Sequence, residues 1–280
     1  MVRASIWTAA LGMFSLVSAA PAAAQDMMRH IDLTSPEMTS AEMTRADVEA
    51  VIAAATSDQP ADFTGKKLSG LDLSGLDLSG ALLRAARLNR TKLNNAKLDR
   101  AILDQAWLLE ADLSRASLRG ANIFAAQMQR AKLDGANLSG ARIAADLTGA
   151  SLVGALLIGA NLSADMKNQS MGLMRANILS ANLRGADLSG SDFSRADFSF
   201  SDLSGANLAG AKLSGAEFSG TDMRGANLAG ADLSGSNFID TDFTGANLAD
   251  ANFTAATFRS VRGIDGANTQ GTRGLPARTR

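Results

Sequence analysis

The sequence repeats with a period of five residues between Phe63 and Phe258, and this period constrains the fold more than any other feature. The central residue of the repeat is large and apolar in 39 of 40 repeats, and the exception is Asn168. Alanine stands two positions before the centre in 29 of these 40 repeats, and serine or threonine in six more. A period of five fits neither an α-helix nor a regular strand, so the chain must turn after every few residues.

Each repeat predicts a very short strand followed by a corner. On an extended segment Ala111 and Leu113 point to one face and Asp112 points to the other. The next two residues, often Ser-Gly or Arg-Gly, turn the chain, because glycine tolerates positive φ. Repeated units then wind into coils that share one interior, in which each buried leucine contributes about 1.5–3 kcal/mol. The sequence therefore predicts an all-β solenoid.

The pattern A-[DN]-L-x-x over residues 61–258 resembles the pentapeptide repeat family. The resemblance implies a right-handed, four-sided parallel β-helix with about twenty residues in each coil, and so about ten coils over residues 61–260. The sequence supports a spacing of twenty, because four phenylalanine centres recur at that interval. We expect them to stack as an aromatic ladder in the core: Phe198, Phe218, Phe238 and Phe258.

The register of the repeats breaks once. Leu147 arrives one residue early after Ile143, and the original phase has returned by Ile178. We expect residues 144–170 to be irregular. Two interpretations stay open, a tolerated bulge or a functional loop around residues 166–171.

The segment before the repeats, residues 25–60, predicts a capping helix over residues 45–56. Its apolar residues follow helical spacing, and Thr44 with Asp47 resembles a capping box. A helix here would cover the first coil, whose unpaired backbone groups would otherwise be open to association.

The segment after the repeats, residues 261–280, is rich in glycine, threonine and arginine and predicts a flexible basic tail. No helix is predicted at this end. The last coil would then be uncapped, and a homodimer formed through it is a hypothesis for the oligomeric state.

Residues 1–24 have the pattern of a signal peptide: Arg3, an apolar run over residues 6–20, and small residues before a cleavage site near Ala24-Gln25. The alternative is an uncleaved anchor. No later stretch is long enough to cross a bilayer, so no integral membrane span is expected in the mature chain. The sequence thus predicts a periplasmic or secreted bacterial protein.

Catalytic chemistry has no support in the sequence. Cysteine is absent, His30 is the one histidine, and no nucleophile, zinc or phosphate-binding motif occurs. Four aspartates that occupy one coil, residues 187, 192, 197 and 202, point from different sides and cannot converge on a cation. We therefore expect no enzyme, cofactor or metal, and the formal charge of −1 gives no indication of nucleic acid binding.

Two surface features remain as candidates for partner contact. Residues 61–143 carry a net charge of +5 and residues 181–258 a net charge of −6, which is either ordinary solubility or a dipolar rod. Apolar residues at outward positions are the stronger indication, unless the N-terminal helix or the tail covers them. They form two groups: Leu82, Ile102, Trp107 and Leu109, then Val153, Leu156, Ile158 and Leu179.

The sequence favours a non-enzymatic, exported structural or binding protein, a rigid rod that mediates protein–protein contact in the cell envelope with a partner that it does not identify. The family resemblance implies an alternative. Some pentapeptide repeat proteins resemble duplex DNA and bind DNA gyrase, a role that requires a cytoplasmic location and an acidic rod.

Overall fold

The computed structural model describes residues 32–164 and 175–275. The predicted signal peptide, His30 and the repeat centres at Asn168 and Leu173 lie outside the described residues. The described part forms one compact unit from Asp32 onward. Its regular elements are few: α1 (Pro36–Thr39), α2 (Arg45–Ala54), β1 (Asn237–Ile239), β2 (Thr257–Arg259) and the 3₁₀ helix η3 (Ile264–Gly266).

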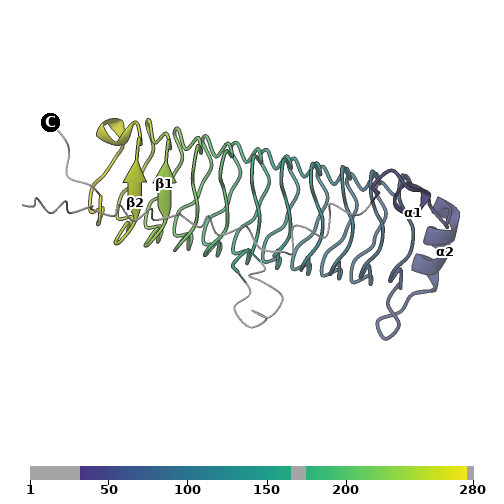
Figure 1. Ribbon diagram of the computed structural model, residues 1–280. Coiled ribbons are helices and arrows are strands. Elements are labelled where there is room, and N and C mark those ends of the chain that lie inside the picture. The colour runs from purple at the N-terminus through teal and green to yellow at the C-terminus, as the bar shows by residue number, and fades with distance from the viewer. Residues whose placement is uncertain (1–31, 165–174, 276–280) are drawn as a thin grey trace, which may run out of the picture. The chain divides into compact units, whose positions relative to one another are not determined.

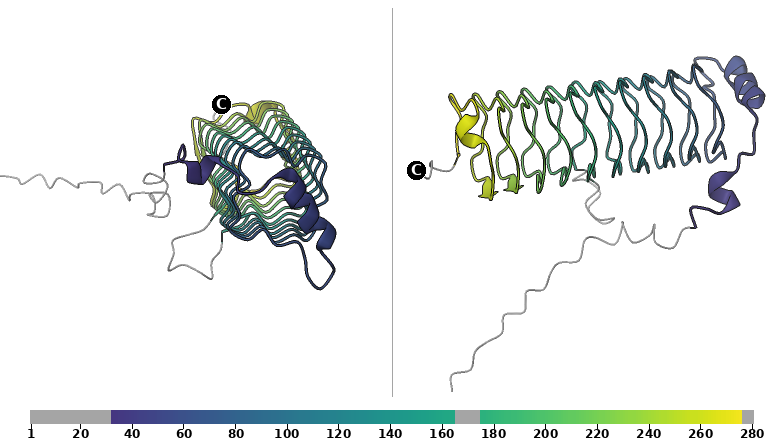
Figure 2. Two further views of the ribbon diagram at one scale, coloured as in Figure 1. Left: turned by 90° about the vertical axis from the view of Figure 1, so that its right-hand side faces the viewer. Right: turned by 90° about the horizontal axis from the view of Figure 1, so that it is seen from above.

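The five-residue repeats wind into stacked coils, as predicted (Figure 1). Equivalent residues of successive coils pair in parallel at an interval of twenty, for example Asp72 with Lys92. Viewed along the stack, the coils have four corners (Figure 2). Most contacts between coils are single bridges, because each side is only a few residues long, and β1 and β2 alone pair over three residues. The fold is therefore a four-sided parallel β-helix.

The interior contains the residues that the repeat predicts. Leu113, Leu133 and Phe218 are fully buried, and the alanine two places before each centre is buried beside them. The predicted aromatic ladder is present. The rings of Phe198 and Phe218 stack with centroids 5.2 Å apart, those of Phe218 and Phe238 are 5.0 Å apart, and those of Phe238 and Phe258 are 5.2 Å apart.

Hydrogen bonds explain why aspartate or asparagine so often precedes the centre. The Asp72 carboxylate accepts a bond from the backbone N–H of Ser74 at 3.1 Å, and Asn137 accepts one from Ser139 at 3.0 Å. In these repeats the side-chain turn gives a partner to a backbone N–H beside the corner. The corner residue itself has positive φ, near 66° at Gly220, which accounts for the frequent glycine there.

The N-terminal end of the stack is covered by α2 (Figure 2). Thr44 and Asp47 form the predicted capping box, and Val48 is fully buried against the core of the coils. The helix ends at Ala54, slightly before the predicted boundary at residue 56.

The prediction of a flexible tail from residue 261 is wrong for residues 261–275. Arg262, Asn268 and Arg273 pair with Asp242, Asn247 and Asn252 of the coil before, so the β-helix continues past the last recognisable repeat. Turns replace the missing pattern. The corner at Gly263 has φ 78°, and a Cβ there would overlap the backbone of Thr244, so only glycine lets this coil approach so closely.

The predicted register break is visible in the pairing. Gln127 pairs with Asp146, an interval of 19, and Asp146 pairs with Asn177, an interval of 31. The second interval exceeds the usual twenty by 31 − 20 = 11 residues. The extra residues lie between Asp146 and Asn177. The two interpretations, a tolerated bulge within residues 144–170 or a functional loop around residues 166–171, stay open, because residues 165–174 lie outside the described residues. On either side of these residues the coils stack in one continuous ladder.

Candidate binding surfaces

The four sides of the coil carry different outward residues, and two of them are named here by the residue before each centre. The charged side is defined by a bridged ladder of ten residues: Asp72, Lys92, Asp112, Lys132, Ser151, Asn182, Asp202, Asp222, Asp242 and Arg262. The amide side follows it in every coil and is defined by another ladder: Asp77, Lys97, Ser117, Asn137, Leu156, Asp187, Asn207, Asn227, Asn247 and Asn268.

Three apolar side chains on one coil face the solvent. Val153, Leu156 and Ile158 are exposed by 39%, 38% and 44%. Val153 lies on the charged side, and Leu156 and Ile158 lie on the amide side. Leu156 pairs with Asn137 before it and Asp187 after it, so apolar surface replaces polar surface on this coil alone. The sequence predicted this group from the outward positions of the repeat.

Leu179, the fourth member predicted for this group, lies elsewhere. Its carbonyl accepts a bond from Gly149 at 2.9 Å, which puts it on the side that precedes the charged side. Leu179 is half-buried. The structure therefore brings together Val153, Leu156 and Ile158, and leaves Leu179 apart.

The other predicted group divides between two sides. Leu82 and Ile102 pair directly with one another on one side, and Trp107 pairs with Arg87 and Gln127 on the next. Leu109 follows Trp107 on that side. All four side chains are half-buried rather than exposed.

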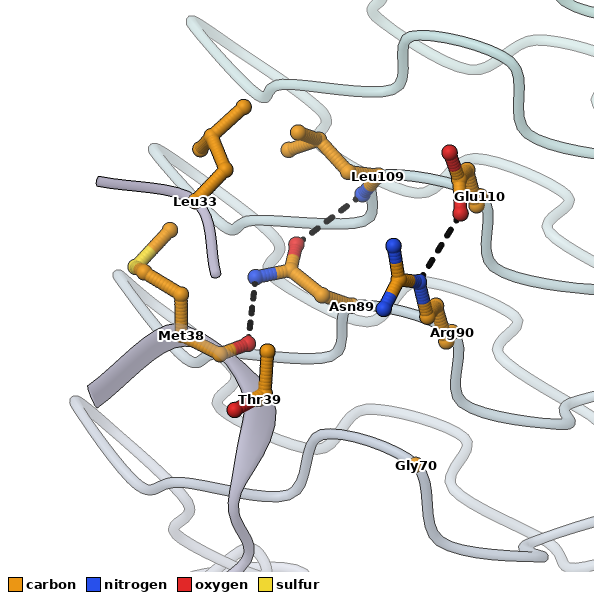
Figure 3. A pocket seen from close by; sticks show the side chains of 8 residues that line it. All are labelled: Leu33, Met38, Thr39, Gly70, Asn89, Arg90, Leu109 and Glu110. Atoms are coloured by element: carbon orange, nitrogen blue, oxygen red, sulfur yellow. Dashed lines mark hydrogen bonds and ion pairs between the residues drawn. The ribbon is translucent and has the colours of Figure 1, made fainter. Parts of the chain in front are cut away.

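Leu109 is covered by the segment that precedes α2. Together with Leu33 and Met38 of that segment it lines a cavity of about 100 Å³ (Figure 3). The alternative raised from the sequence, that a chain segment covers the first apolar group, therefore holds for this residue.

Asn89 attaches the segment to the coils, a role that the sequence analysis did not predict. The side chain is buried, its Nδ2 donates to the carbonyl of Met38 at 3.0 Å, and its Oδ1 accepts from the backbone N–H of Leu109 at 3.0 Å (Figure 3). Beside it Arg90 and Glu110 form an ion pair of 2.8 Å. These polar groups already have partners, so we interpret the cavity as a packing gap between the segment and the coils.

Charge and backbone pairing strengthen the same attachment. Glu37 of α1 pairs with Lys67 at 2.8 Å and with Arg87 at 3.8 Å. The Lys67 hydrogen bond and its charge hold the pKa of Glu37 below its usual value. Ala41 forms an antiparallel bridge with Leu68, so the segment adds a short strand to the first coil.

Phe200 is the most exposed large apolar residue of the described chain, at 66%. It occupies a corner with φ 61°, a conformation that costs a bulky residue energy. Its ring lies over Gly220 of the next coil, where a Cβ would come within 2.6 Å of Phe200 Cδ1. The sequence analysis missed it, although a phenylalanine at a position where the repeat places glycine is a readable signal.

The charged side changes character along the stack. In the first coils aspartate and lysine alternate, and Lys92 lies 3.5 Å from Asp72. In the later coils three aspartates stack on one another: Asp202, Asp222 and Asp242. Each has an arginine nearby, the closest being Arg224 at 2.6 Å from Asp222, and this hydrogen bond keeps the pKa of Asp222 below its usual value.

Acidic residues and histidine are the candidate metal ligands of this chain. No group of three or more histidine, cysteine or acidic residues within residues 32–164 and 175–275 is arranged to hold a metal ion. Asp187, Asp192, Asp197 and Asp202 occupy four different sides, as expected. Among the same residues no helix is long and apolar enough to span a membrane.

Comparison with known proteins identifies the repeat. The family model for pentapeptide repeats matches eight copies within residues 67–140, 143–164 and 191–259. HetL, a pentapeptide repeat protein involved in heterocyst differentiation regulation in the cyanobacterium Nostoc sp. strain PCC 7120, is 31% identical, with 82% of this chain and 98% of HetL covered and a TM-score of 0.55. No curated protein matches the chain in sequence.

Two further solved structures are similar at lower scores. Rfr23, a pentapeptide repeat protein of the cyanobacterium Cyanothece 51142, is 27% identical over 40% of this chain and 89% of its own, with a TM-score of 0.31. Trypsin-treated QnrB1, a plasmid-mediated fluoroquinolone resistance protein, is 22% identical over 70% of this chain and 88% of its own, with a TM-score of 0.39. Neither score is high enough to transfer a role.

Proposed function

Because the chain belongs to the pentapeptide repeat family, we propose that it is a non-enzymatic, exported binding protein whose β-helix presents a contact surface to a protein partner in the cell envelope. The observation that carries the proposal is the exposed group Val153, Leu156 and Ile158. Apolar side chains gathered on one coil of an otherwise polar surface are typical of contact sites. The export signal predicted at residues 1–24 supports the envelope as the compartment.

The regular stacking of the coils fixes the positions of the side chains on such a surface. Residues at equivalent positions of successive coils lie about 4.8 Å apart, and the backbone ladder fixes their order. A partner would therefore meet a preorganised surface and would order few side chains on binding.

Site-specific photocrosslinking in cells tests the proposal. A crosslinking residue in place of Ile158 is expected to capture an envelope protein, and one in place of Ala229 is the matched control. Both positions follow a repeat centre on the amide side, but the first is surrounded by apolar residues and the second by asparagine and alanine. Equal capture from both positions, or capture from neither, would refute the apolar surface as the contact site.

Fractionation with N-terminal sequencing tests the compartment. The expected mature protein begins at or near Gln25 and is found outside the cytoplasm. Recovery from the cytosol with residues 1–24 intact would instead favour the DNA-mimicking alternative. The net charge of +5 over residues 61–143 argues against that alternative, because a DNA mimic needs an acidic surface.

Self-association through the C-terminal end is the second part of the proposal. No α-helix covers this end among the described residues, and the core reaches the surface there through Phe258, Val261 and Ile264, which are half-buried. The end differs in this respect from the N-terminal end, where α2 buries Val48 completely. A second copy could bury these side chains and pair the last backbone groups.

A further inference from the structure

The charges along the charged side are complementary to the charges of the same side taken in the opposite direction. Its ten residues divide at the midpoint between Ser151 and Asn182. Residues at equal distances from that point have opposite charge in three of the four charged pairs. These are Lys132 with Asp202, Lys92 with Asp242, and Asp72 with Arg262. The fourth pair, Asp112 with Asp222, is alike in charge.

The charged side shares this property with one of the other three sides. Reversing the amide side about its midpoint between Leu156 and Asp187 leaves at least one asparagine in every pair beyond that central pair, so no opposite charges meet. The side of Leu82 and Ile102 has eleven residues, from Asp62 to Arg273, and its reversal about Asn161 sets Arg142 opposite Asp192 and Asp62 opposite Arg273, which are opposite in charge. On the side of Trp107 the reversal pairs no opposite charges. Self-complementary charge is therefore found on two of the four sides, with three opposite pairs on the charged side and two on the side of Leu82 and Ile102, and it does not follow from the repeat alone.

We propose that two copies of this chain pair side by side and antiparallel through the charged side, about a two-fold axis that passes between the coils of Ser151 and Asn182. A two-fold axis sets each residue opposite its equivalent at the same distance beyond the midpoint. Lys132 of one copy then meets Asp202 of the other, and each such contact occurs twice. The proposal rests on the proposed binding function and names a partner for one of its surfaces.

The residues near the axis suit close approach. Ser151 and Asn182 are uncharged, Gly154 has no side chain, and Val153 exposes 39% of its surface. Under this axis Val153 of each copy faces Arg184 of the other, which follows the next repeat centre on the same side. The charged pairs of the ladder lie at increasing distances from the axis in both directions.

The charges on this side are only partly satisfied within one chain. Among the described residues Lys132 has no ion pair, and the nearest cation to Asp202 is Arg184 at 3.8 Å. Asp202, Asp222 and Asp242 bridge one another in consecutive coils, where stacked like charges repel. Lysines from a second copy reduce this repulsion. At Asp222, opposite Asp112, Arg224 already donates from Nε to Oδ1 and from Nη2 to Oδ2, and this bidentate partner offsets the one like-charged pair.

Analytical ultracentrifugation of the mature full-length protein tests the proposal. Wild type is expected to dimerise at micromolar concentration, more weakly as salt is raised. Lys132→Asp and Asp202→Lys, each alone, are expected to weaken dimerisation at least about tenfold, because each sets like charges together twice. The double variant is expected to restore it, since opposite charges face each other again. This restoration also excludes misfolding as the cause of the single defects.

Matched controls separate the outcomes. Lys97→Asp makes the same charge reversal on the amide side, where Lys97 has an intrachain partner, Asp77, at 3.5 Å, and is expected to leave dimerisation unchanged. A monomer at every concentration overturns the proposal. A dimer that Ile264→Asp abolishes and Lys132→Asp does not affect also overturns it, and assigns self-association to the C-terminal end. A monomer would also refute self-association through the C-terminal end, but either result leaves capture of an envelope protein through Ile158 unaffected, so the first part of the proposed function can survive the failure of this contact.

Discussion

The two halves of the β-helix follow one backbone path with different chemistry. Before the register break the interior is filled mainly by leucine, and Lys97 pairs with Asp77 on the exposed amide side at 3.5 Å. After the break phenylalanine rings stack in the interior, and asparagines on the amide side donate to one another, for example Asn227 to Asn207 at 3.0 Å. The interval between paired residues is twenty in both halves, except for the last two bridges, Asn247 with Asn268 and Asn252 with Arg273, where it is 21.

The comparison teaches that the repeat determines the path of the backbone but not which side-chain interactions hold neighbouring coils together. Exposed ion pairs contribute only about 0–1 kcal/mol each, whereas hydrogen bonds contribute about 0.5–1.5 kcal/mol and depend little on salt. We therefore expect the later half to hold its coils together more firmly under salt or acid. The following predictions test that difference from its largest expected effect to its smallest.

Removing a rung of the aromatic ladder should have the largest effect. Phe218 is fully buried between two stacked rings, so Phe218→Ala leaves a cavity and should cost about 3–5 kcal/mol. Phe200→Ala is the matched control, because the same atoms are removed from a side chain that is 66% exposed. Chemical denaturation followed by circular dichroism measures both. Equal losses from the two variants would mean that the ladder is not what stabilises the later half.

Replacing glycine by alanine at the same repeat position in two coils should reveal the contact between Phe200 and Gly220. Gly220→Ala and Gly140→Ala both place alanine at positive φ, near 66° and 67°, which costs about 1–2 kcal/mol. Only Gly220 lies under a ring, with Cδ1 at 2.6 Å from the new Cβ, so its variant should unfold at lower denaturant. Combining it with Phe200→Ala should remove the difference. An excess cost that persists in the double variant would contradict this explanation.

Much of this molecule could be predicted from the sequence, because a five-residue period determines which side chains share the interior. Leu113 and Phe218 are buried as expected, and the outward apolar group at Val153 follows from the same count. Asn89 could not be foreseen, since its partner is the carbonyl of Met38, which is distant in sequence. The coil after residue 260 was missed because turns at Gly263 and η3 continue the bridges without the apolar pattern.

The amide ladder and the ion-pair ladder should respond differently to salt. Asn227→Ala removes a donor to Asn207 at 3.0 Å and an acceptor for Asn247 at 2.9 Å, and should cost about 1–2 kcal/mol at any salt concentration. Lys97→Ala removes one exposed ion pair and should cost at most about 1 kcal/mol, falling toward zero in molar salt. Denaturation at low and high salt measures both. If the stability lost in Asn227→Ala depended on salt, the two halves would not differ in the interactions that hold their coils together.

The smallest expected effect is that of a single carboxylate on the pH dependence of stability. The Ser79 side chain, then its backbone N–H and Lys97, lower the pKa of Asp77 against the opposing effect of burial. A carboxylate whose pKa is lower in the folded chain than its unfolded value of about 3.9 stabilises the fold above that pH, and this contribution is lost as the pH falls through the folded value. Asparagine occupies the same position at Asn137 and there accepts the bond from Ser139, so Asp77→Asn should keep the turn and lose only the titration. Between pH 7 and pH 5 the two proteins should therefore differ by a constant amount, and below about pH 4 the wild type should lose slightly more stability. If wild type and Asp77→Asn lose stability in parallel down to about pH 3, other carboxylates cause the acid sensitivity of the first half, and the ionisation of Asp77 does not stabilise its coils.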